Sequence, residues 1–319
     1  PELVAKSLNH PSATSGVQRL IVGPRVVFEQ GLATAKVDCK IPITDSIDTA
    51  FELDEDCIFV EFNPNNLKDP IQGESTAAAG ASDLEIAKLA TDLFRRELID
   101  GFVFAPVNKL SLKMGGSKFE GYKAFIADDL NVSAESAEIN TIGYLWTTRV
   151  TSHIAIDDVP KKITENNVYE IIRYFDRELK RFGYKNPKIA VSGLNPHNGD
   201  GGMFGREEID AIEPAVARSR NEKLNVSGPY PPDTVFLTAQ KEKFLGVVSM
   251  YHDQGQIATK LLGFDEGVTY FGGLPFPITT PAHGTAYDIA GSGEASETPM
   301  VNALNLMRRA ALTAKGIAI

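Results

Sequence analysis

The sequence has few cysteines and no long apolar run. Its two cysteines, Cys39 and Cys57, lie in strand-like apolar runs without a second potential metal ligand nearby, so we expect buried free thiols in a reducing compartment. No apolar run approaches the roughly 20 residues that span a bilayer, and no charged-then-apolar leader precedes the first helical pattern. These absences predict a soluble cytoplasmic protein that makes no membrane contact.

Basic residues are also scarce relative to acidic ones. The chain has 32 Lys and Arg residues against 42 Asp and Glu residues, a formal net charge of −10. No stretch rich in Lys and Arg is interleaved with aromatic residues in the way that a nucleic-acid-binding surface would require. We therefore expect no nucleic-acid partner, and the length of 319 residues fits one large or two closely joined domains.

Strand-like apolar runs alternate with helical patterns along the chain, which predicts a mostly parallel sheet covered by helices. The runs cover residues 20–22, 57–62, 101–105, 141–147, 189–192 and 246–250, and the longest helical patterns cover 79–99, 166–182, 206–220 and 298–315. The chain opens on a helical pattern that begins at Pro1. Because α/β domains usually begin with a strand, we expect that a segment precedes Pro1 in the full protein.

Four of the five histidines lie in short polar or glycine-rich segments outside the long helical patterns: His153, His197, His252 and His283. The first three each follow a strand-like run, and ligand groups gather at the carboxyl ends of strands in open α/β sheets. Three imidazoles with a nearby carboxylate can hold Zn²⁺ or a similar ion, and Asp233 and Asp253 could orient them. The alternative is that each histidine caps a backbone carbonyl in a loop.

Two segments rich in small residues are candidates for anion or nucleotide binding. Residues 193–208 form a glycine-rich turn that enters a helix, where backbone N–H groups can approach an anion. In residues 283–293, small residues would let adenine and ribose lie against the backbone, although no Gly-x-Gly-x-x-Gly fingerprint is present. The residues concerned are His283, Gly284, Thr285, Ala286, Asp288, Gly291 and Gly293. Either segment could instead be a plain structural connection.

Three lysines are candidate anion holders: Lys109, Lys123 and Lys260. Lys109 follows a strand end, and Lys260 lies eight residues after His252. A lysine is more often a solvated surface charge, so both interpretations stay open for each of them.

Three motifs in order resemble the 4-hydroxythreonine-4-phosphate dehydrogenase (PdxA) family. They are Gly-Leu-Asn-Pro-His at 193–197, Tyr-His-Asp-Gln-Gly at 251–255, and His-Gly-Thr-Ala at 283–286 followed by Asp-Ile-Ala-Gly at 288–291. The resemblance covers nearly the whole chain. It implies a three-layer α/β/α fold of the isocitrate and isopropylmalate dehydrogenase type, with a cleft between two subdomains. Residues 1–108 and 256–319 would bind the nucleotide, and residues 109–255 would bind the metal and form the dimer.

The same resemblance implies the cofactors and the assembly. A divalent ion, zinc or one of Mg, Mn, Co and Fe, would be held by His153, His197 and His252 from both subunits of a homodimer, with acidic support from Asp233 and Asp253. NAD or NADP would lie along residues 283–293. The family's usual opening strand and glycine-rich loop would end where Pro1 begins.

Departures from the family pattern fall at its phosphate-binding positions. Phosphate-binding members carry a His-Thr pair where this chain has Tyr122 and Lys123. They carry Asn where this chain has Thr269, and Arg where it has Ile278. The lysine at position 260 is the same in both. An arginine fork grips phosphate through paired charge-assisted hydrogen bonds, which an isoleucine cannot supply. The pattern is similar to the terephthalate cis-dihydrodiol dehydrogenase branch, and these five positions would contact the substrate.

We therefore expect NAD(P)-linked, metal-dependent oxidation of a β-hydroxy carboxylate, a non-phosphorylated cis-dihydrodiol carboxylate, followed by loss of CO₂. Lys260, Asp253 and Asp233 are the candidate catalytic residues. One alternative is the same chemistry on 4-hydroxythreonine-4-phosphate or another four-carbon phosphorylated acid. A second is a catalytically silent metal-binding relative.

Overall fold

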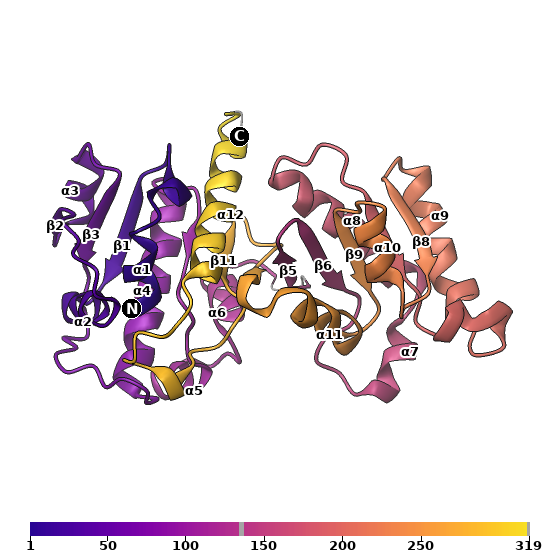
Figure 1. Ribbon diagram of the computed structural model, residues 1–319, viewed down its shortest axis with the longest axis horizontal. Helices are drawn as coiled ribbons and strands as arrows, with labels where there is room; N and C mark the ends of the chain where they lie inside the picture. Colours follow the sequence, from indigo (N-terminus) through magenta and orange to yellow (C-terminus); the bar gives the residue numbers. More distant parts are fainter. Residues whose placement is uncertain (134–136, 318–319) are drawn as a thin grey trace. The chain divides into compact units, whose positions relative to one another are not determined.

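The computed structural model describes residues 1–133 and 137–317, and the chain divides into two compact units (Figure 1). Unit 1 consists of Pro1–Ala134 and Leu274–Ile319, and unit 2 of Glu135–Gly273. Unit 1 is therefore discontinuous in sequence, since the chain leaves it once and returns for the C-terminal helix.

Unit 1 combines short strands with helices on both sides. Its elements are α1 (Glu2–Ser7), η1 (Pro11–Thr14), β1 (Arg19–Gly23), α2 (Arg25–Ala35), β2 (Ile43–Thr44), α3 (Ile47–Glu52), β3 (Cys57–Glu61), α4 (Ala77–Arg95), β4 (Phe102–Val103), α5 (Lys109–Met114), α6 (Tyr122–Asp129), β11 (Ile278–Pro281), η6 (Tyr287–Ile289) and α12 (Thr298–Ala314). Strands β1, β3 and β2 form a parallel sheet in that order, and β4 pairs in parallel with β11.

Strand β3 shows why helices cover both faces of the first sheet. Ile58 and Val60 pack with Ala50 of α3, whereas the ring of Phe59 stacks on Phe28 of α2 with centroids 4.3 Å apart. Successive side chains of a strand point to opposite faces, so α2 and α3 lie on opposite sides of the sheet.

Unit 2 is built around one mixed sheet. Its elements are β5 (Ile139–Ile142), β6 (Leu145–Arg149), η2 (Ile156–Asp158), α7 (Val159–Lys162), α8 (Glu165–Arg181), β7 (Ile189–Ser192), η3 (Pro196–Gly202), η4 (Glu208–Ile212), α9 (Glu213–Asn221), β8 (Val226–Tyr230), α10 (Val235–Lys241), β9 (Gly246–Ser249), α11 (His252–Gly263), η5 (Phe264–Glu266) and β10 (Val268–Tyr270). The strand order is β10-β5-β6-β9-β7-β8. Strands β6, β9, β7 and β8 are parallel, and β5 is antiparallel to both of its neighbours.

Helices cover both faces of this sheet as well. At Gly246 a Cβ atom would lie 2.5 Å from the Phe175 ring of α8, so the glycine lets α8 approach the strand closely. The next residue, Val247, packs with Val235 and Ala239 of α10. The expected three-layer α/β/α arrangement is therefore confirmed, with α8 on one face and α10 on the other.

The chain crosses from one unit to the other at different residues from the expected domain boundaries at 108 and 255. Residues 109–134 belong to unit 1 because α5 and α6 pack on α4. Residues 256–273 belong to unit 2, because α11 packs on β5, β6 and β9 and β10 pairs with β5.

Most predicted strands and long helices are present, with local differences. The run 141–147 is two antiparallel strands, β5 and β6, since Gly143 with φ of 55° turns the chain back. The helix expected over 206–220 begins as the π-helical turn η4 before α9. Cys39 and Cys57 are free but only half-buried, and Cys39 lies outside any strand. No helix in the described part of the chain is long and apolar enough to span a membrane.

Candidate functional site

Three adjacent parallel strands of unit 2 lead to three of the histidines. Strands β6, β9 and β7 are neighbours in the sheet. His153 follows β6, His252 begins α11 directly after β9, and His197 lies in η3 after β7. The carboxyl ends of parallel strands meet at one edge of a sheet, where ligand sites form in α/β folds. The expected common exit of the three histidines is therefore confirmed.

Hydrogen bonds join the three strand ends to one another. The Thr151 hydroxyl donates to the Met250 carbonyl at 2.9 Å. The Gln254 side chain accepts from the Met250 N–H at 2.6 Å and donates to the Gly193 carbonyl at 2.9 Å. The segments that carry His153, His252 and His197 are thus fixed relative to one another at this edge.

His153 and His252 face each other across this edge. Their ring centroids are 5.6 Å apart, with an angle of 43° between the planes. Nδ1 of His252 lies 2.7 Å from Oδ1 of Asp253, which leaves Nε2 as the ring nitrogen for a ligand. A carboxylate that orients a histidine in this way is typical of metal sites, so the donor chemistry fits a divalent ion.

The other predicted metal-site residues do not lie beside His153 and His252 within one chain. Among residues 1–133 and 137–317 of one chain, no group of three His, Cys, Asp or Glu side chains could hold a metal ion. His197 is exposed, and so is Asp233 in the loop after β8. One chain therefore assembles two of the three histidines, with Asp253 beside them.

A polar network that the sequence did not reveal lies on the neighbouring strands. The Asn140 amide donates to the Thr269 hydroxyl at 3.0 Å and accepts from Gln256 at 2.8 Å. The Arg149 guanidinium, only 3% exposed, donates to Asn140 at 3.3 Å and to Ser152, beside His153, at 2.9 Å. Because Asn140 and Arg149 sit inside apolar strand patterns, nothing in the sequence set them apart from core positions.

Two predicted substrate contacts lie in the core of unit 1. Tyr122 is 5% exposed, and its hydroxyl donates to the Asp83 carbonyl at 2.7 Å while its ring packs on Phe104. Ile278 is fully buried in β11. Both side chains are buried, so neither presents a polar group at the surface of the chain. Lys123 is half-buried and Lys260 is exposed.

The predicted nucleotide segment begins directly after β11 in unit 1. Its backbone is held by Lys6, whose Nζ donates to the carbonyls of Gly293 at 2.8 Å and Ala295 at 2.6 Å. His283 is half-buried, whereas Gly284 and Asp288 are exposed. A Cβ atom at Gly284 would meet nothing within 4 Å. The segment is therefore accessible, with a position open for close approach of a ligand.

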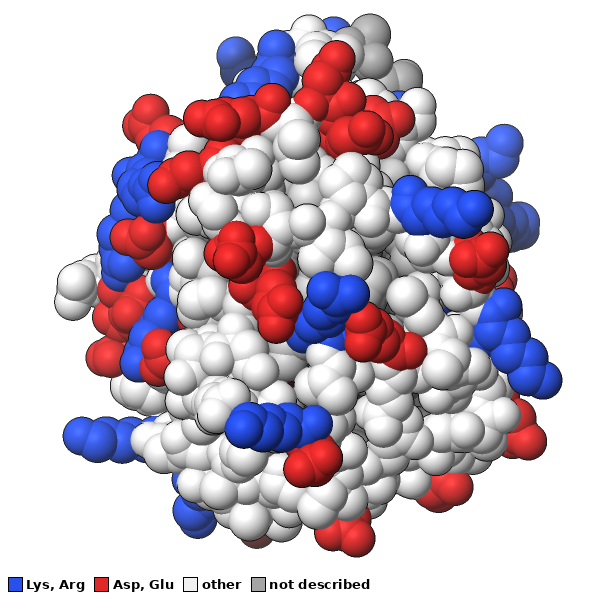
Figure 2. All heavy atoms as spheres, turned by 90° about the vertical axis from the view of Figure 1, so that its left-hand side faces the viewer, with Lys and Arg blue, Asp and Glu red and all other residues white. Residues whose placement is uncertain are grey.

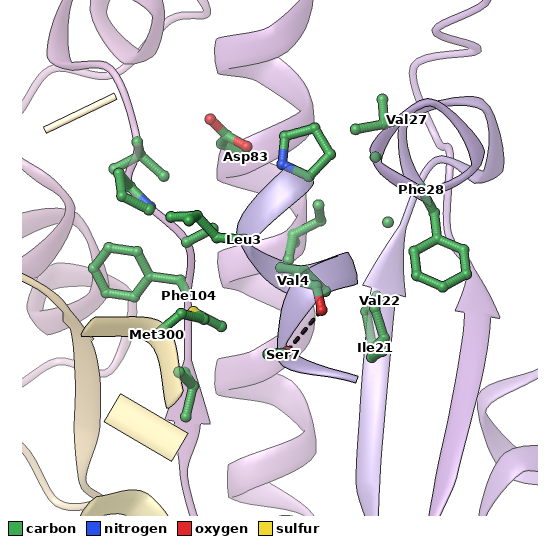
Figure 3. A pocket seen from close by; sticks show the side chains of 18 of the residues that line it. Leu3, Val4, Ser7, Ile21, Val22, Val27, Phe28, Asp83, Phe104 and Met300 are labelled. Carbon is green, nitrogen blue, oxygen red and sulfur yellow. Dashed lines mark hydrogen bonds between the residues drawn. The ribbon is translucent and has the colours of Figure 1, made fainter. Parts of the chain in front are cut away.

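Unit 1 also contains a cavity of about 870 Å³ that reaches this segment (Figure 3). Its lining is largely apolar, with Leu3, Ile21 and Phe28 among its walls, and includes Asp83, where burial raises the carboxyl pKa to about 7. Strands β1 and β4, each at a sheet edge, line it as well. Unpaired strand edges suit an extended peptide as well as a flat cofactor. The cavity does not by itself indicate a nucleotide site.

Charged side chains of both signs are mixed on one face of unit 1. On the face of unit 1 shown in Figure 2, acidic and basic side chains are interspersed among uncharged residues, without a continuous basic area. This mixture of signs agrees with the modest net charge of −10 for the whole chain.

Comparison with known proteins decides the family. The family model described as pyridoxal phosphate biosynthetic protein PdxA matches residues 16–307. The chain belongs to the PdxA family. A Rhizobium meliloti (strain 1021) protein, provisionally named 4-hydroxythreonine-4-phosphate dehydrogenase 2, is 42% identical over 295 residues, which cover 92% of this chain and 84% of that protein. This PdxA family member is accordingly a dehydrogenase.

Solved structures agree with this assignment. The 4-hydroxythreonine-4-phosphate dehydrogenase of Klebsiella pneumoniae is 34% identical with a TM-score of 0.81, over 98% of this chain and 94% of that one. The terephthalate 1,2-cis-dihydrodiol dehydrogenase of Burkholderia xenovorans LB400 is 24% identical with a TM-score of 0.67, over 97% and 93%, which shows a shared fold alone. The expectation of a dihydrodiol substrate is thus supported less well than its phosphorylated alternative.

Proposed function

We propose that this PdxA family member catalyses NAD(P)-linked, metal-dependent oxidation of a four-carbon phosphorylated β-hydroxy acid of the 4-hydroxythreonine-4-phosphate type, followed by loss of CO₂. The observation that carries the proposal is the pairing of His153 with the Asp253-supported His252 in a chain similar throughout to 4-hydroxythreonine-4-phosphate dehydrogenases. The active form in this proposal is a homodimer.

The histidines would hold the divalent ion. His153 and His252 supply one pair of imidazoles, with Asp253 orienting His252 through Nδ1, and His197 completes the set from the partner subunit. When bound, such an ion polarises a hydroxyl or carbonyl oxygen and lowers the pKa of a bound hydroxyl. The hydrogen bonds of Gln254 and Thr151 keep the strand ends in register, so the imidazoles are oriented before the substrate arrives.

Other residues would bind the remaining groups of the substrate and the cofactor. Lys260, exposed in the last turn of α11, offers a positive charge to the carboxylate or phosphate of the substrate. Thr269 and Asn140 present a fixed hydroxyl and amide. The segment 283–293 would bind the nucleotide, with Asp288 as an acceptor for ribose hydroxyls and Gly284 allowing close contact.

One observation keeps a second candidate substrate in view. Ile278 stands where phosphate-binding members carry an arginine, and it is buried, so it supplies no donor to a phosphate. A cis-dihydrodiol carboxylate, which needs no such fork, is therefore the second candidate.

A direct comparison of substrates tests the proposal. With NAD⁺ or NADP⁺ and Mn²⁺, Co²⁺ or Zn²⁺ present, we expect kcat/KM for 4-hydroxythreonine-4-phosphate to exceed that for a cis-dihydrodiol dicarboxylate by at least tenfold, or about 1.4 kcal/mol. Initial rates of reduced cofactor formation measure both values. Reversal of that order would establish the second candidate, and turnover of neither compound would contradict both.

The nucleotide segment can be tested separately at Gly284. Because a Cβ atom there meets no neighbour, the Gly284→Val protein is expected to fold normally and to keep its metal. The branched side chain would keep adenosine from the backbone and raise the cofactor KM by roughly tenfold. An unchanged cofactor KM, with an unchanged melting temperature, would move the nucleotide to another part of the chain.

A further inference from the structure

His197 lies in a left-handed turn of the backbone. Successive residues from 197 to 201 have positive φ, namely His197 (51°), Asn198 (56°), Gly199 (74°), Asp200 (44°) and Gly201 (67°). The left-handed conformation is unfavourable for a residue that carries a Cβ atom, and His197, Asn198 and Asp200 all adopt it. A backbone of this kind persists only where surrounding contacts hold it in place.

Glu208 makes the contacts that hold the start of this turn. Its side chain is 1% exposed. Oε1 accepts hydrogen bonds from the Leu194 N–H at 2.8 Å and the Asn195 N–H at 2.7 Å, and Oε2 accepts from the Asn195 amide at 2.9 Å. Charge-assisted hydrogen bonds of this kind are stronger than neutral ones, so one buried carboxylate fixes two successive residues just before His197.

The backbone of the turn packs closely around the Glu208 carboxylate. A Cβ atom on Gly193 would lie 3.0 Å from Oε1 of Glu208, and one on Gly199 would lie 2.9 Å from Oε2. The glycines on both sides of His197 thus let the chain close around the carboxylate. Glu208 is also the first residue of the π-helical turn η4, and such turns occur frequently at functional sites.

The same short segment is tied to the helix that carries His252. The Gly193 carbonyl accepts from Gln254 at 2.9 Å, while the next two N–H groups along the chain donate to Glu208. Residues 193–195 are therefore held from two sides, by α11 through Gln254 and by η4 through Glu208. The position of His197 depends on this segment.

We infer that Glu208 is a positioning residue for the proposed metal centre: its carboxylate holds residues 194 and 195 so that the left-handed turn presents His197 as a ligand. The inference rests on the proposed function, since it takes His197 to bind the ion. Glu208 itself touches neither metal nor substrate in this role.

The Glu208→Gln variant tests the inference with little change of shape. Its carbonyl oxygen can still accept from both backbone N–H groups, but its NH₂ group would face the Asn195 NH₂ group, so a donor meets a donor. Removing a residue that orients a metal ligand commonly costs 10–100-fold in affinity. We expect the Kd of the full-length protein for Co²⁺, titrated through its visible absorption, to rise by about that factor. Amide hydrogen exchange at Leu194 and Asn195 should quicken in the metal-free protein.

Two further proteins make the experiment specific. Glu213→Gln, the same change at an exposed residue of α9, should leave Co²⁺ affinity and exchange unchanged. Should Glu208→Gln fail to fold, Asn195→Ala, which removes the amide contacts to Glu208 and Glu207 but keeps the backbone N–H bond to Glu208, should still weaken Co²⁺ binding.

The outcomes separate this inference from the proposed function. If His197→Ala weakens Co²⁺ binding and Glu208→Gln does not, the inference is wrong and the proposed function stands. If exchange quickens in Glu208→Gln at unchanged Co²⁺ affinity, Glu208 is only structural and the inference is again overturned. If His197→Ala itself binds Co²⁺ normally, both fail.

Discussion

Replacement of His252 by alanine is expected to abolish metal retention and to lower kcat/KM by about three orders of magnitude. Among the described residues, His252 alone of the histidines has both a facing imidazole, His153 at 5.6 Å between ring centroids, and an orienting carboxylate, Asp253 at 2.7 Å. A bound ion contributes several kcal/mol of charge stabilisation in the transition state, and each 1.4 kcal/mol is tenfold in rate. Metal content by mass spectrometry and steady-state kinetics measure both effects. His153→Ala and His197→Ala should behave alike.

The fifth histidine provides a matched control. His10 lies in unit 1 with its Nε2 3.5 Å from Oε1 of Glu297, and it has no place in the proposed site. His10→Ala should keep full metal content and turnover. Asp253→Asn, which retains the size of the orienting side chain, should lose roughly 10–100-fold in metal affinity. Full metal occupancy in any one of His153→Ala, His197→Ala or His252→Ala would mean that the site is misassigned.

The sequence predicts the places where chain segments leave the sheet better than it predicts which side chains meet there. The runs before His153, His197 and His252 are strands as expected, because uninterrupted apolar runs of this length are typical of buried parallel strands. The adjacency of β6, β9 and β7 depends on the topology of the whole sheet, so no local sequence pattern predicts it.

Burial could not be predicted at two of the expected substrate positions. The expectation for Tyr122 and Ile278 rests on what stands at these positions in related sequences, whereas the structure buries both side chains. The Tyr122 hydroxyl donates to the Asp83 carbonyl. Tyr122, which the sequence suggests as a polar contact to the substrate, is therefore a core residue in the structure. Conversely, Glu208 and Arg149 are almost fully buried although charged residues rarely are. Their hydrogen-bond partners lie on other segments, which a linear pattern cannot pair.

Gly80 of α4 allows this helix to pack directly against the backbone of α5 in unit 1. A Cβ atom on Gly80 would lie 1.8 Å from the Ser111 carbonyl oxygen and 2.8 Å from the Leu112 nitrogen, both backbone atoms of α5. Reciprocally, a Cβ atom on Gly115 would lie 2.3 Å from the Ala81 nitrogen. The two helix backbones are in direct contact here, so a side chain can be added only if α4 and α5 move apart.

Gly80→Ala is therefore expected to destabilise the protein by about 3 kcal/mol, even though alanine favours an isolated helix by up to about 1 kcal/mol over glycine. Overpacking of a close contact costs typically 1–3 kcal/mol and occasionally more, and backbone atoms at this distance cannot rotate away. In a chain of 319 residues the melting temperature should fall by roughly 4–5 °C, which calorimetry measures. Gly121→Ala is the matched control, since its Cβ meets no atom within 4 Å and its φ of −168° suits any residue. If both variants have the melting temperature of the parent protein, α4 and α5 do not approach each other as closely as in the structure.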